Sequence, residues 1–442
     1  MLLKIEKMIY GGDGLSRLPA DEKGRSKAVF TPFVLAGEKI EARIIGQKPS
    51  FARGRPEYIL ESSPHRIEPR CPYFGRCGGC HYQHASYKHQ LEIKKGILEE
   101  TLRRVAKVEL ATPIQVHASP PWNYRNRSRV QVQTSPEFAV GYFKMGSHEL
   151  LPVEECPISS TLINRGIAEL WKMGREGKVP ADVREVEFFA NAEDSQLLVE
   201  ISCGTEARRA SLRSWAEEWR AAMPEIAGVV VFRTNEHSRN AEKMLVSGAD
   251  HLTYRTEKTA YRVSAGSFFQ TNRFLINELV RIVAEGRSGK LALDLYAGVG
   301  LFSTALACDI HHIVSVEMSQ TSTGDLSYNR PSNGEVIQAT TEQFLERREQ
   351  SRRVGAGAVL PHISYQPDLA VVDPPRSGRG ERVARGLANL GAPRVTYVSC
   401  DPATLARDLV VLLGAGYRIE QLHLVDLFPQ TFHLETVVHL VR

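Results

Sequence analysis

The sequence lacks a long hydrophobic segment. Its 442 residues contain no run of about 18 apolar residues, the length at which a membrane-spanning helix becomes a candidate. The first residues, MLLKIEKMIY, mix charged and apolar side chains and lack the apolar core of a signal peptide. These absences predict a soluble, cytoplasmic protein with no part in a membrane.

Cysteine is scarce as well, with seven residues in the chain. An odd number of cysteines without a secretion signal argues against a scaffold of disulfide bonds. Hydrophobic residues make up 42% and charged residues 24% of the chain, which is ordinary for a globular protein and argues against a disordered or fibrous one. We therefore expect thiols that serve chemistry or metal binding, in a chain long enough for two or three domains.

Positive charge is concentrated in the first third of the chain. Residues 1–135 contain 23 Lys and Arg against 13 Asp and Glu, a net charge of +10, whereas the remainder contains 33 against 38, a net charge of −5. Because a basic surface attracts polyanions, one interpretation is that a nucleic acid docks on the first part while the chemistry takes place further on. The alternative is an ordinary solvated surface.

The first 62 residues predict a small β-barrel. Short β-rich runs alternate with turn signals, above all the glycine-rich turn at residues 11–14. The pattern resembles the TRAM domain, an RNA-binding barrel of RNA-modifying enzymes, and an unspecialised small β-domain is the alternative. Basic side chains suited to an oligonucleotide-binding barrel are Lys4, Lys7, Arg17, Lys23, Arg25, Lys27, Lys48, Arg53 and Arg55.

Residues 63–265 predict a mixed central domain. Apolar residues recur at helical spacing over residues 87–107, which predicts a helix, with packing on the C-terminal domain as one option. A strand at residues 121–133 would present Arg125, Arg127 and Arg129 on one face, either to RNA phosphates or simply to solvent.

From residue 266 to residue 442 the pattern changes to alternating strands and helices. Apolar runs such as LALDLYAG, HIVSVEMS, LAVVDPP and RVTYVSCDP are separated by segments of helical length. This alternation predicts an α/β domain with a doubly wound sheet, in which ligands bind beyond the carboxyl ends of the strands.

A glycine-rich turn follows the first of these strands. Asp294 precedes the turn, Gly298 and Gly300 form it, and Glu317 ends the next strand, where a carboxylate can bind both hydroxyls of a ribose. A nicotinamide dinucleotide is one ligand for such a unit. The missing third glycine and the acidic residue before the turn favour S-adenosylmethionine instead.

Three further strand ends carry reactive side chains. Asp373 stands before two prolines that stiffen its loop, Cys400 ends a strand, and Glu435 interrupts an apolar strand. Carbon 5 of uracil attacks a methyl donor only after a thiolate has added to carbon 6, and a base must later remove the proton on carbon 5. Cys400 and Glu435 fit these two roles, and Arg376 is a candidate for the positive charge that favours the thiolate.

These motifs resemble, in order and spacing, the RNA 5-methyluridine methyltransferase family along essentially the whole chain: residues 268–272 (FFQTN), 294–300, 373–376, 398–402 and 426–435. The resemblance implies a Rossmann-like class I methyltransferase domain with Cys400 as nucleophile, Glu435 as base and Asp373 at the uracil edge. It also implies cofactor contacts from Gln270, Tyr296, Glu317, Asp294, Gly298, Gly300 and Asp373. One departure is Asp401, where the family usually has Asn and where a carboxylate facing the sulfur would raise the pKa of the thiol.

Four cysteines predict a metal centre. Cys71, Cys77 and Cys80 are followed much later by Cys156, and four thiolates suit either tetrahedral zinc or a four-iron cluster. Prolines after Cys71 and Cys156 favour an iron–sulfur loop, and the same pattern occurs in iron–sulfur members of the family. We expect a 4Fe-4S cluster with a structural or RNA-positioning role, since methyl transfer moves no net electrons.

The resemblance implies RNA as partner, most of all 23S ribosomal RNA, with transfer RNA as the alternative. The target base would leave its stack and be held by stacking, for which Phe269 is a candidate, although core packing explains that residue as well. An amino-directed methyltransferase that uses Asp373 without a cysteine is one rival. A noncatalytic iron–sulfur protein that binds RNA is another.

Overall fold

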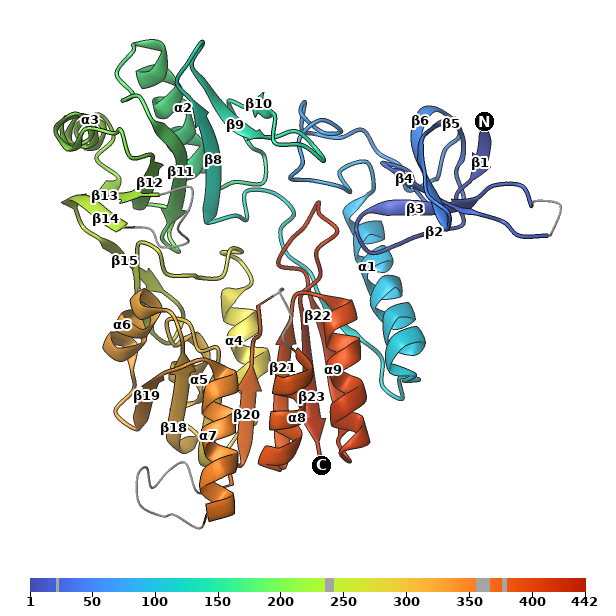
Figure 1. Ribbon diagram of the computed structural model, residues 1–442, viewed down its shortest axis with the longest axis vertical. Coiled ribbons are helices and arrows are strands. Elements are labelled where there is room, and N and C mark those ends of the chain that lie inside the picture. The colour runs from blue at the N-terminus through green and yellow to red at the C-terminus, as the bar shows by residue number, and fades with distance from the viewer. Residues whose placement is uncertain (21–23, 235–241, 355–365, 376–379) are drawn as a thin grey trace.

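The computed structural model describes residues 1–20, 24–234, 242–354, 366–375 and 380–442. Its strands form a six-stranded N-terminal sheet, a seven-stranded central sheet, a two-stranded ribbon and an eight-stranded C-terminal sheet (Figure 1). Among the described residues, no helix combines the length and the apolar character needed to cross a membrane.

The N-terminal sheet is curled, and its first segment touches both of its ends. β1 pairs with β5, and a few residues later β2 pairs with β3, so the segment passes from one end of the sheet to the other. A small apolar core that includes Val29, Ile40 and Ala52 fills the inside. The strands are β1 (Leu2–Lys4), β2 (Lys7–Met8), β3 (Asp13–Arg17), β4 (Ala28–Pro32), β5 (Lys39–Gln47) and β6 (Phe51–Glu61).

The central sheet has a core on each face because side chains alternate along a strand. Phe188 and Val199 face the helices α2 (Thr161–Arg175) and α3 (Arg209–Ala222), whereas Phe189 and Leu198 face the C-terminal part of the chain. In spatial order its strands are β10 (Leu150–Pro152), β9 (Ala139–Phe143), β8 (Arg127–Gln133), β11 (Val183–Ala190), β12 (Leu197–Cys203), β13 (Ile226–Arg233) and β14 (Glu242–Gly248).

The α/β expectation for the C-terminal part is confirmed. A ribbon of β15 (His251–Arg255) and β16 (Ala260–Ser264) precedes it. The strands of the sheet, in spatial order, are β19 (Gly334–Gln338), β18 (Ile310–Glu317), β17 (Gly289–Leu295), β20 (Leu369–Val372), β21 (Arg394–Ser399), β23 (Thr436–Val441), β22 (Arg418–Val425) and β7 (Gln115–His117). All pairs are parallel except those that β23 makes.

Helices cover both faces of this sheet. On one face, α4 (Ile276–Ala284) and α5 (Leu301–Leu306) share a core with the central sheet, so the two sheets are packed into one body. The other face is covered by α7 (Thr341–Val354), α8 (Gly380–Leu390) and α9 (Pro402–Gly414), while α6 (Gln320–Asn329) packs against β16 and β19.

The segment after the N-terminal sheet belongs spatially to the C-terminal sheet. Helix α1 (Tyr87–Thr101) continues into the π-helical turn η1 (Leu102–Ala106), and both pack against α9 through residues such as Leu98 and Leu409. Figure 1 shows α1 beside α9. Strand β7 then adds to the edge of the sheet next to β22. This segment thus crosses over before the chain enters the central sheet.

Candidate active site at the carboxyl edge of the C-terminal sheet

The pairing of β21 with β23 brings Cys400 and Glu435 together. The last pair in this antiparallel ladder joins Ser399 to Thr436, and the Thr436 hydroxyl also donates to the Ser399 carbonyl at 3.0 Å. Cys400 directly follows Ser399, and Glu435 directly precedes Thr436, so the two residues are neighbours across the ladder. Glu435 is buried, with 4% of its surface exposed, and Cys400 is half-buried.

Asp373 lies at the same edge, one strand away from Cys400. It follows Val372, which pairs with Leu295 on β17 and with Tyr397 on β21. The backbone N–H of Asp373 donates to the Leu295 carbonyl at 3.3 Å. Burial, and next the charge of Asp294, raise the pKa of Asp373. Arg376, the candidate partner of the thiolate, lies outside the described residues.

The glycine-rich turn is held by the carboxylate of Glu317. This carboxylate accepts hydrogen bonds from the backbone N–H groups of Gly298 at 2.9 Å, Met318 at 2.9 Å and Ser319 at 2.7 Å. Gly298 and Gly300 have φ values of +56° and +93°, and a Cβ on Gly300 would meet Leu326 at 2.8 Å. Glycine is therefore required at Gly300, both for the left-handed backbone and for the close approach.

Asp294 is a buried carboxylate with one open acceptor. It is 1% exposed, and its Oδ2 accepts a hydrogen bond from the Ser303 hydroxyl at 2.5 Å. Its Oδ1 is buried without a hydrogen-bond partner among the described residues. Burial raises the pKa of Asp294 to about 6, and the negative charge of Glu317 adds to the rise. An orphaned buried acceptor next to the glycine turn suits a cationic or amino-bearing ligand.

Gln270 is buried, and the two aromatic residues before it differ in their exposure. Gln270 is 7% exposed, and its carbonyl accepts a hydrogen bond from the Asn126 amide at 3.1 Å. Phe269 is 2% exposed, and its ring packs 4.5 Å from that of Tyr254. Of the two interpretations of Phe269, core packing is therefore confirmed. Phe268, which the sequence analysis did not single out, is 61% exposed.

Asp401 has a structural partner. It is the N-cap of α9, and its Oδ1 accepts from the backbone N–H of Thr404 at 2.8 Å. One oxygen of this carboxylate is therefore engaged in a cap, which stabilises a helix start by about 1 kcal/mol.

The four predicted metal cysteines line one cavity. Cys71, Cys77, Cys80 and Cys156 surround a space of about 210 Å³, together with Arg125 and Gln83. Burial raises the pKa of the Cys77 thiol to about 11, and the neighbouring thiols add to the rise. Among the described residues, no three cysteine sulfur atoms lie within 4.8 Å of one another.

Two arginines predicted at an RNA-facing strand are engaged elsewhere. Arg127 pairs with Glu187 at 3.1 Å and with Glu200 at 3.3 Å, and its side chain is only 12% exposed. Arg129 contacts Glu187 at 2.7 Å. The interpretation of a phosphate-binding face is therefore wrong for Arg127, because neighbouring carboxylates already neutralise it. Arg125 instead lines the cysteine cavity.

Known proteins share this architecture. The model of the tRNA (uracil-5-)-methyltransferase family matches residues 86–442 of the chain. An uncharacterized RNA methyltransferase of Aquifex aeolicus is 33% identical over 443 residues, which cover 98% of this chain and 97% of the relative. The chain belongs to the tRNA (uracil-5-)-methyltransferase family. The reaction of this family, methylation of carbon 5 of uracil in RNA, is therefore that of the chain.

Two further comparisons concern the target RNA of a relative and the fold. A 23S rRNA (uracil(1939)-C(5))-methyltransferase of Pseudomonas entomophila is 30% identical over 451 residues, which cover 98% of this chain and 92% of the relative. The crystal structure of the Pyrococcus abyssi tRNA (uracil-54, C5)-methyltransferase, in complex with S-adenosyl-L-homocysteine, has a TM-score of 0.75 at 22% identity and covers 100% of both chains. The fold is thus shared over the full length, while the two relatives act on different RNAs.

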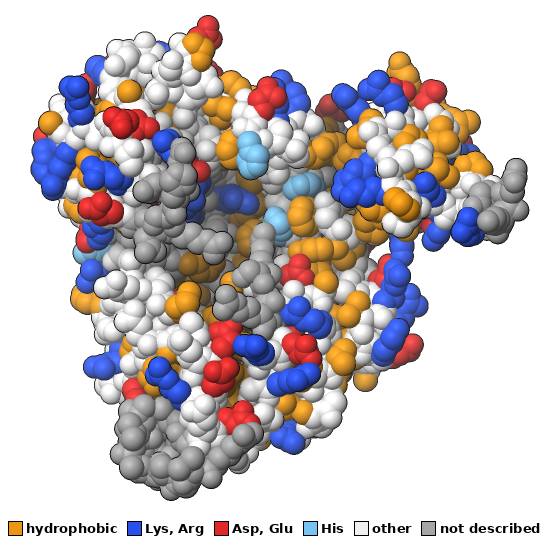
Figure 2. Space-filling model, viewed as in Figure 1, with side chains coloured by type: hydrophobic (Ala, Val, Ile, Leu, Met, Phe, Trp, Pro, Cys, Tyr) orange, Lys and Arg blue, Asp and Glu red, His pale blue; other side chains and the backbone are white. Residues whose placement is uncertain are grey.

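The face of the molecule is hollowed between the N-terminal sheet, the central sheet and the C-terminal sheet. Figure 2 shows basic and histidine side chains on the walls of this hollow.

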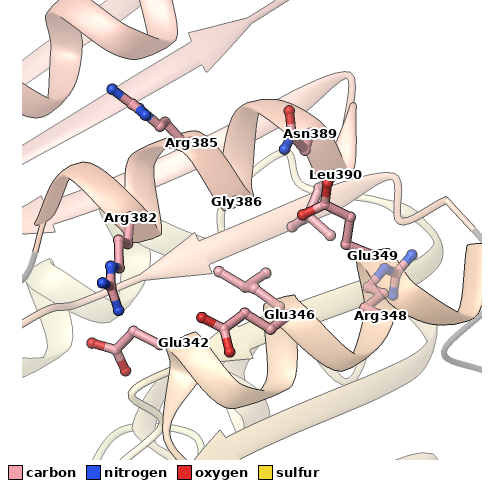
Figure 3. Close-up of a pocket in the computed structure, with 10 residues that line it drawn as sticks. Glu342, Glu346, Arg348, Glu349, Arg382, Arg385, Gly386, Asn389 and Leu390 are labelled. Carbon is pink, nitrogen blue, oxygen red and sulfur yellow. The ribbon is translucent and has the colours of Figure 1, made fainter. Parts of the chain in front are cut away.

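A separate cavity of about 790 Å³ lies between α7 and α8. Its lining includes the charged side chains of Glu342, Glu346, Arg382 and Arg385 (Figure 3). No predicted site residue of this methyltransferase lines the second cavity.

One contact, which joins the N-terminal sheet to Cys400 directly after β21, was not predicted from the sequence. The hydroxyl of Tyr10, in the turn between β2 and β3, donates to the carbonyl of Cys400 at 3.3 Å, and its ring packs edge-on against Phe432 at 5.3 Å. The two residues of this hydrogen bond lie 390 positions apart, and no local pattern around Tyr10 signals the contact. The N-terminal sheet therefore touches the carboxyl edge of the C-terminal sheet, where the candidate site lies.

We predict that Asp294→Asn stabilises the cofactor-free enzyme and weakens its binding of S-adenosylhomocysteine. A carboxyl whose pKa rises on folding binds more protons in the folded state, so stability falls as the pH rises from 3.8 to about 6. The cost at neutral pH is about 3 kcal/mol, because one pH unit of pKa corresponds to about 1.4 kcal/mol. Melting curves at pH 7 and calorimetric titrations with S-adenosylhomocysteine measure both effects.

The matched control is Asp309→Asn, at an exposed aspartate. It should change neither quantity. A melting temperature at pH 7 that does not rise in Asp294→Asn, or an unchanged affinity for S-adenosylhomocysteine, would contradict the prediction.

Proposed function

We propose that the enzyme uses S-adenosylmethionine to methylate carbon 5 of one uridine in 23S ribosomal RNA, through a covalent bond between Cys400 and carbon 6 of the base. The observation that carries the proposal is the pairing of β21 with β23, which makes a cysteine and a buried glutamate neighbours at the ligand-binding edge of the sheet. A nucleophile and a base are the two groups that uracil methylation needs.

The residues around the glycine turn fit S-adenosylmethionine. The open Oδ1 of Asp294 suits the amino group of the methionine part, and Glu317 suits the ribose hydroxyls. Gln270, Tyr296, Gly298 and Gly300 complete the proposed contacts, and Asp373 adjoins them. When bound, the cofactor supplies an electrophilic methyl group. The Pyrococcus abyssi relative was crystallised with S-adenosyl-L-homocysteine, the product of such a transfer.

The proposed steps use three side chains of this enzyme. The Cys400 thiolate forms a bond to carbon 6 of uracil, and the electron pair of the 5,6 double bond makes carbon 5 the nucleophile. Asp373, whose pKa is raised, holds the polar edge of the base. After carbon 5 has been methylated, Glu435 takes its proton, the 5,6 double bond re-forms, and the bond to the Cys400 sulfur breaks.

We predict that Cys400→Ala abolishes methyl transfer and that Glu435→Gln traps the enzyme on its RNA. An amide cannot take the carbon 5 proton, so the methylated adduct cannot be released. Denaturing gels of the enzyme incubated with unmodified RNA and cofactor should show a stable protein–RNA band for Glu435→Gln only.

The matched control is Cys308→Ala, which removes an exposed thiol and should leave turnover unchanged. Full turnover by Cys400→Ala would sink the covalent mechanism and favour a transfer to an exocyclic amine, the amino-directed alternative based on Asp373. Absence of methyl incorporation by the wild-type enzyme into any cellular RNA would favour a noncatalytic RNA-binding protein.

The proposed target is 23S ribosomal RNA, with transfer RNA as the alternative. The support is the 30% identity with the Pseudomonas entomophila enzyme over 98% of the chain. The N-terminal sheet of the present chain, proposed as the TRAM domain, would bind the RNA near the hollow in Figure 2.

We predict that deletion of the gene removes 5-methyluridine from one position of 23S RNA. Mass-spectrometric mapping of 23S and transfer RNA checks this, and loss confined to transfer RNA would contradict it.

The four cysteines are proposed to hold a 4Fe-4S cluster. Tetrahedral zinc, with bonds of about 2.3 Å, would hold its sulfur atoms about 3.8 Å apart. The four thiols line one cavity of about 210 Å³, and the prolines after Cys71 and Cys156 favour an iron–sulfur loop instead. Arg125 on the cavity wall supplies positive charge against four thiolates.

We predict about four iron atoms per purified chain, measured by metal analysis under anaerobic conditions. One equivalent of zinc without iron would overturn this assignment.

We propose three domains: residues 1–62 for RNA binding, residues 63–265 as the central domain with the cluster, and residues 266–442 as the methyltransferase domain. The sheet order supports one amendment. Because β7 pairs with β22 and α1 packs near α9, residues 87–117 are proposed as a structural part of the methyltransferase domain.

A further inference from the structure

The cysteine cavity and the catalytic edge are joined through the backbone. Cys80 and Cys156 belong to different segments of the chain. The first segment is hydrogen-bonded directly to one part of the proposed active site, and the second reaches another part through residues 124–126. One part carries Glu435, and the other carries Gln270. Both connections begin with backbone hydrogen bonds of the cysteine segments, and side chains complete them.

The first connection runs from Cys80 to the loop that leads to Glu435. The two residues after Cys80 donate their backbone N–H groups to one acceptor, the carbonyl of Gln430, from His81 at 2.8 Å and from Tyr82 at 2.9 Å. The ring of His81 also packs against Phe432, with centroids 4.6 Å apart. The path of the cysteine segment therefore fixes the loop of residues 426–433.

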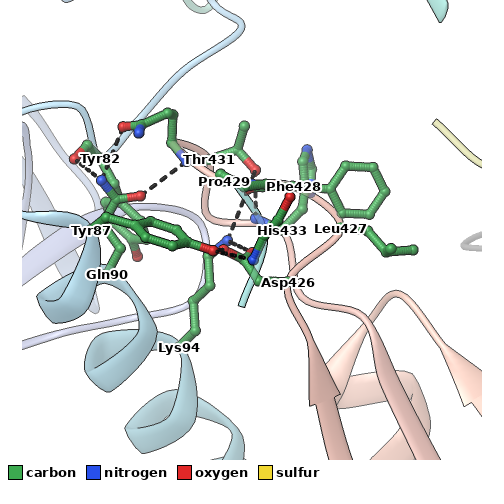
Figure 4. A network of polar contacts seen from close by, with 12 residues as sticks. Tyr82, Tyr87, Gln90, Lys94, Asp426, Leu427, Phe428, Pro429, Thr431 and His433 are labelled. Carbon is green, nitrogen blue, oxygen red and sulfur yellow. Dashed lines mark hydrogen bonds and ion pairs between the residues drawn. The ribbon is translucent and has the colours of Figure 1, made fainter. Parts of the chain in front are cut away.

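Other buried groups hold the same loop (Figure 4). Lys94 donates to the Asp426 carboxylate at 2.6 Å and to the Phe428 carbonyl at 2.9 Å, and both charged side chains are 0% exposed. Gln90 bonds the backbone and the side chain of Gln430, each at 2.9 Å. A loop whose polar groups are satisfied in this way has one conformation, so a displacement at Gln430 is passed along the chain to Glu435.

The second connection runs from Cys156 to Gln270 through residues 124–126. The N–H of Arg125 donates to the Ile158 carbonyl at 2.9 Å, two residues after Cys156. On the other side, the Asn126 N–H donates to the Thr271 carbonyl at 3.1 Å, and the Asn126 amide donates to the Gln270 carbonyl at 3.1 Å. Residues 124–126 thus lie between the cysteine segment and the proposed cofactor contact.

Tyr124 links the two connections. Its side chain is 0% exposed, and its hydroxyl donates to the carbonyl of Pro429 at 2.9 Å. Its own carbonyl accepts the N–H of Arg273 at 3.0 Å. The next residue, Arg125, lines the cysteine cavity. One residue therefore contacts the base-carrying loop and the segment after Gln270, next to a wall of the cavity.

We infer that the four-cysteine centre positions the base Glu435 and the cofactor contact Gln270, with Tyr124 as the positioning residue that joins them. The inference rests on the proposed function, since it assumes these roles for Glu435 and Gln270. The metal closes the two cysteine segments on each other, and the hydrogen bonds carry that geometry to the catalytic edge. Its contribution is thus to the rate of methyl transfer and to cofactor affinity, and RNA affinity is left largely unchanged.

The test compares Tyr124→Phe with Tyr417→Phe in the metal-loaded, full-length enzyme. Tyr417 is a matched control, because its buried hydroxyl also donates to a backbone carbonyl, that of Ala392 at 2.7 Å, next to the amino end of β21. The readouts are kcat at saturating RNA, the dissociation constant of the RNA, the affinity for S-adenosylhomocysteine and the iron content.

Tyr124→Phe should keep its iron and lower kcat about tenfold, the effect of one buried hydrogen bond lost at about 1.4 kcal/mol. Its RNA affinity should stay within about twofold of wild type, and Tyr417→Phe should match wild type in every readout. An unchanged kcat in Tyr124→Phe, or a loss confined to RNA affinity, would overturn the inference.

Hydrogen exchange gives a readout that needs no turnover. In the full-length protein, removal of the metal with a chelator should speed amide exchange in residues 426–435 and 268–272 more than in the N-terminal sheet. Exchange unchanged in these two segments would overturn the inference even if the enzyme proves to modify another base. A wild-type enzyme that forms no 5-methyluridine, with the exchange result intact, would instead count against the proposed function alone.

Discussion

The antiparallel insertion of β23 between β21 and β22 is the constraint on which the active site depends. In a parallel sheet, only residues that follow strands reach the carboxyl edge. Because β23 runs the other way, the residue that precedes it lies at that edge as well, next to the residue that follows β21. The proposed nucleophile, after one strand end, and the proposed base, before one strand start, thereby become neighbours. The register of this ladder fixes their separation, and a slip of one residue would part them.

The same edge accumulates carboxyl groups that are buried or half-buried. Asp294, Asp373 and Glu435 reach it from three strands, and burial raises the pKa of the two aspartates. Such placement costs folding free energy, and cost of this kind is typical of functional sites. A sulfonium cofactor with an amino group would offset part of it. The arrangement thus explains why acidic residues occupy strand ends in an otherwise apolar sheet.

The sequence predicted the features that arise within short stretches. Alternating strands and helices, the glycine turn with Asp294 and Glu317, and the strand-end position of Cys400 all follow from local pattern, and the α/β domain is confirmed. Long-range contacts left no such trace: Tyr10 meets Cys400 across 390 positions, and Lys94 meets Asp426 across 332. Nor did the sequence indicate the residues that pair with Arg127. The carboxylate neighbours that bury and neutralise Arg127 come from other strands, so the alternation within its own strand did not reveal them.

The central claim is that methylation takes place on carbon 5 of uracil through attack by Cys400. The most direct measurement uses RNA that carries tritium on carbon 5 of its uridines and follows tritium release and methyl incorporation together. The account predicts one tritium released for each methyl group transferred by the wild-type enzyme, and neither event with Cys400→Ala. Methyl transfer without tritium release would contradict it, because the methyl group would then lie on another atom.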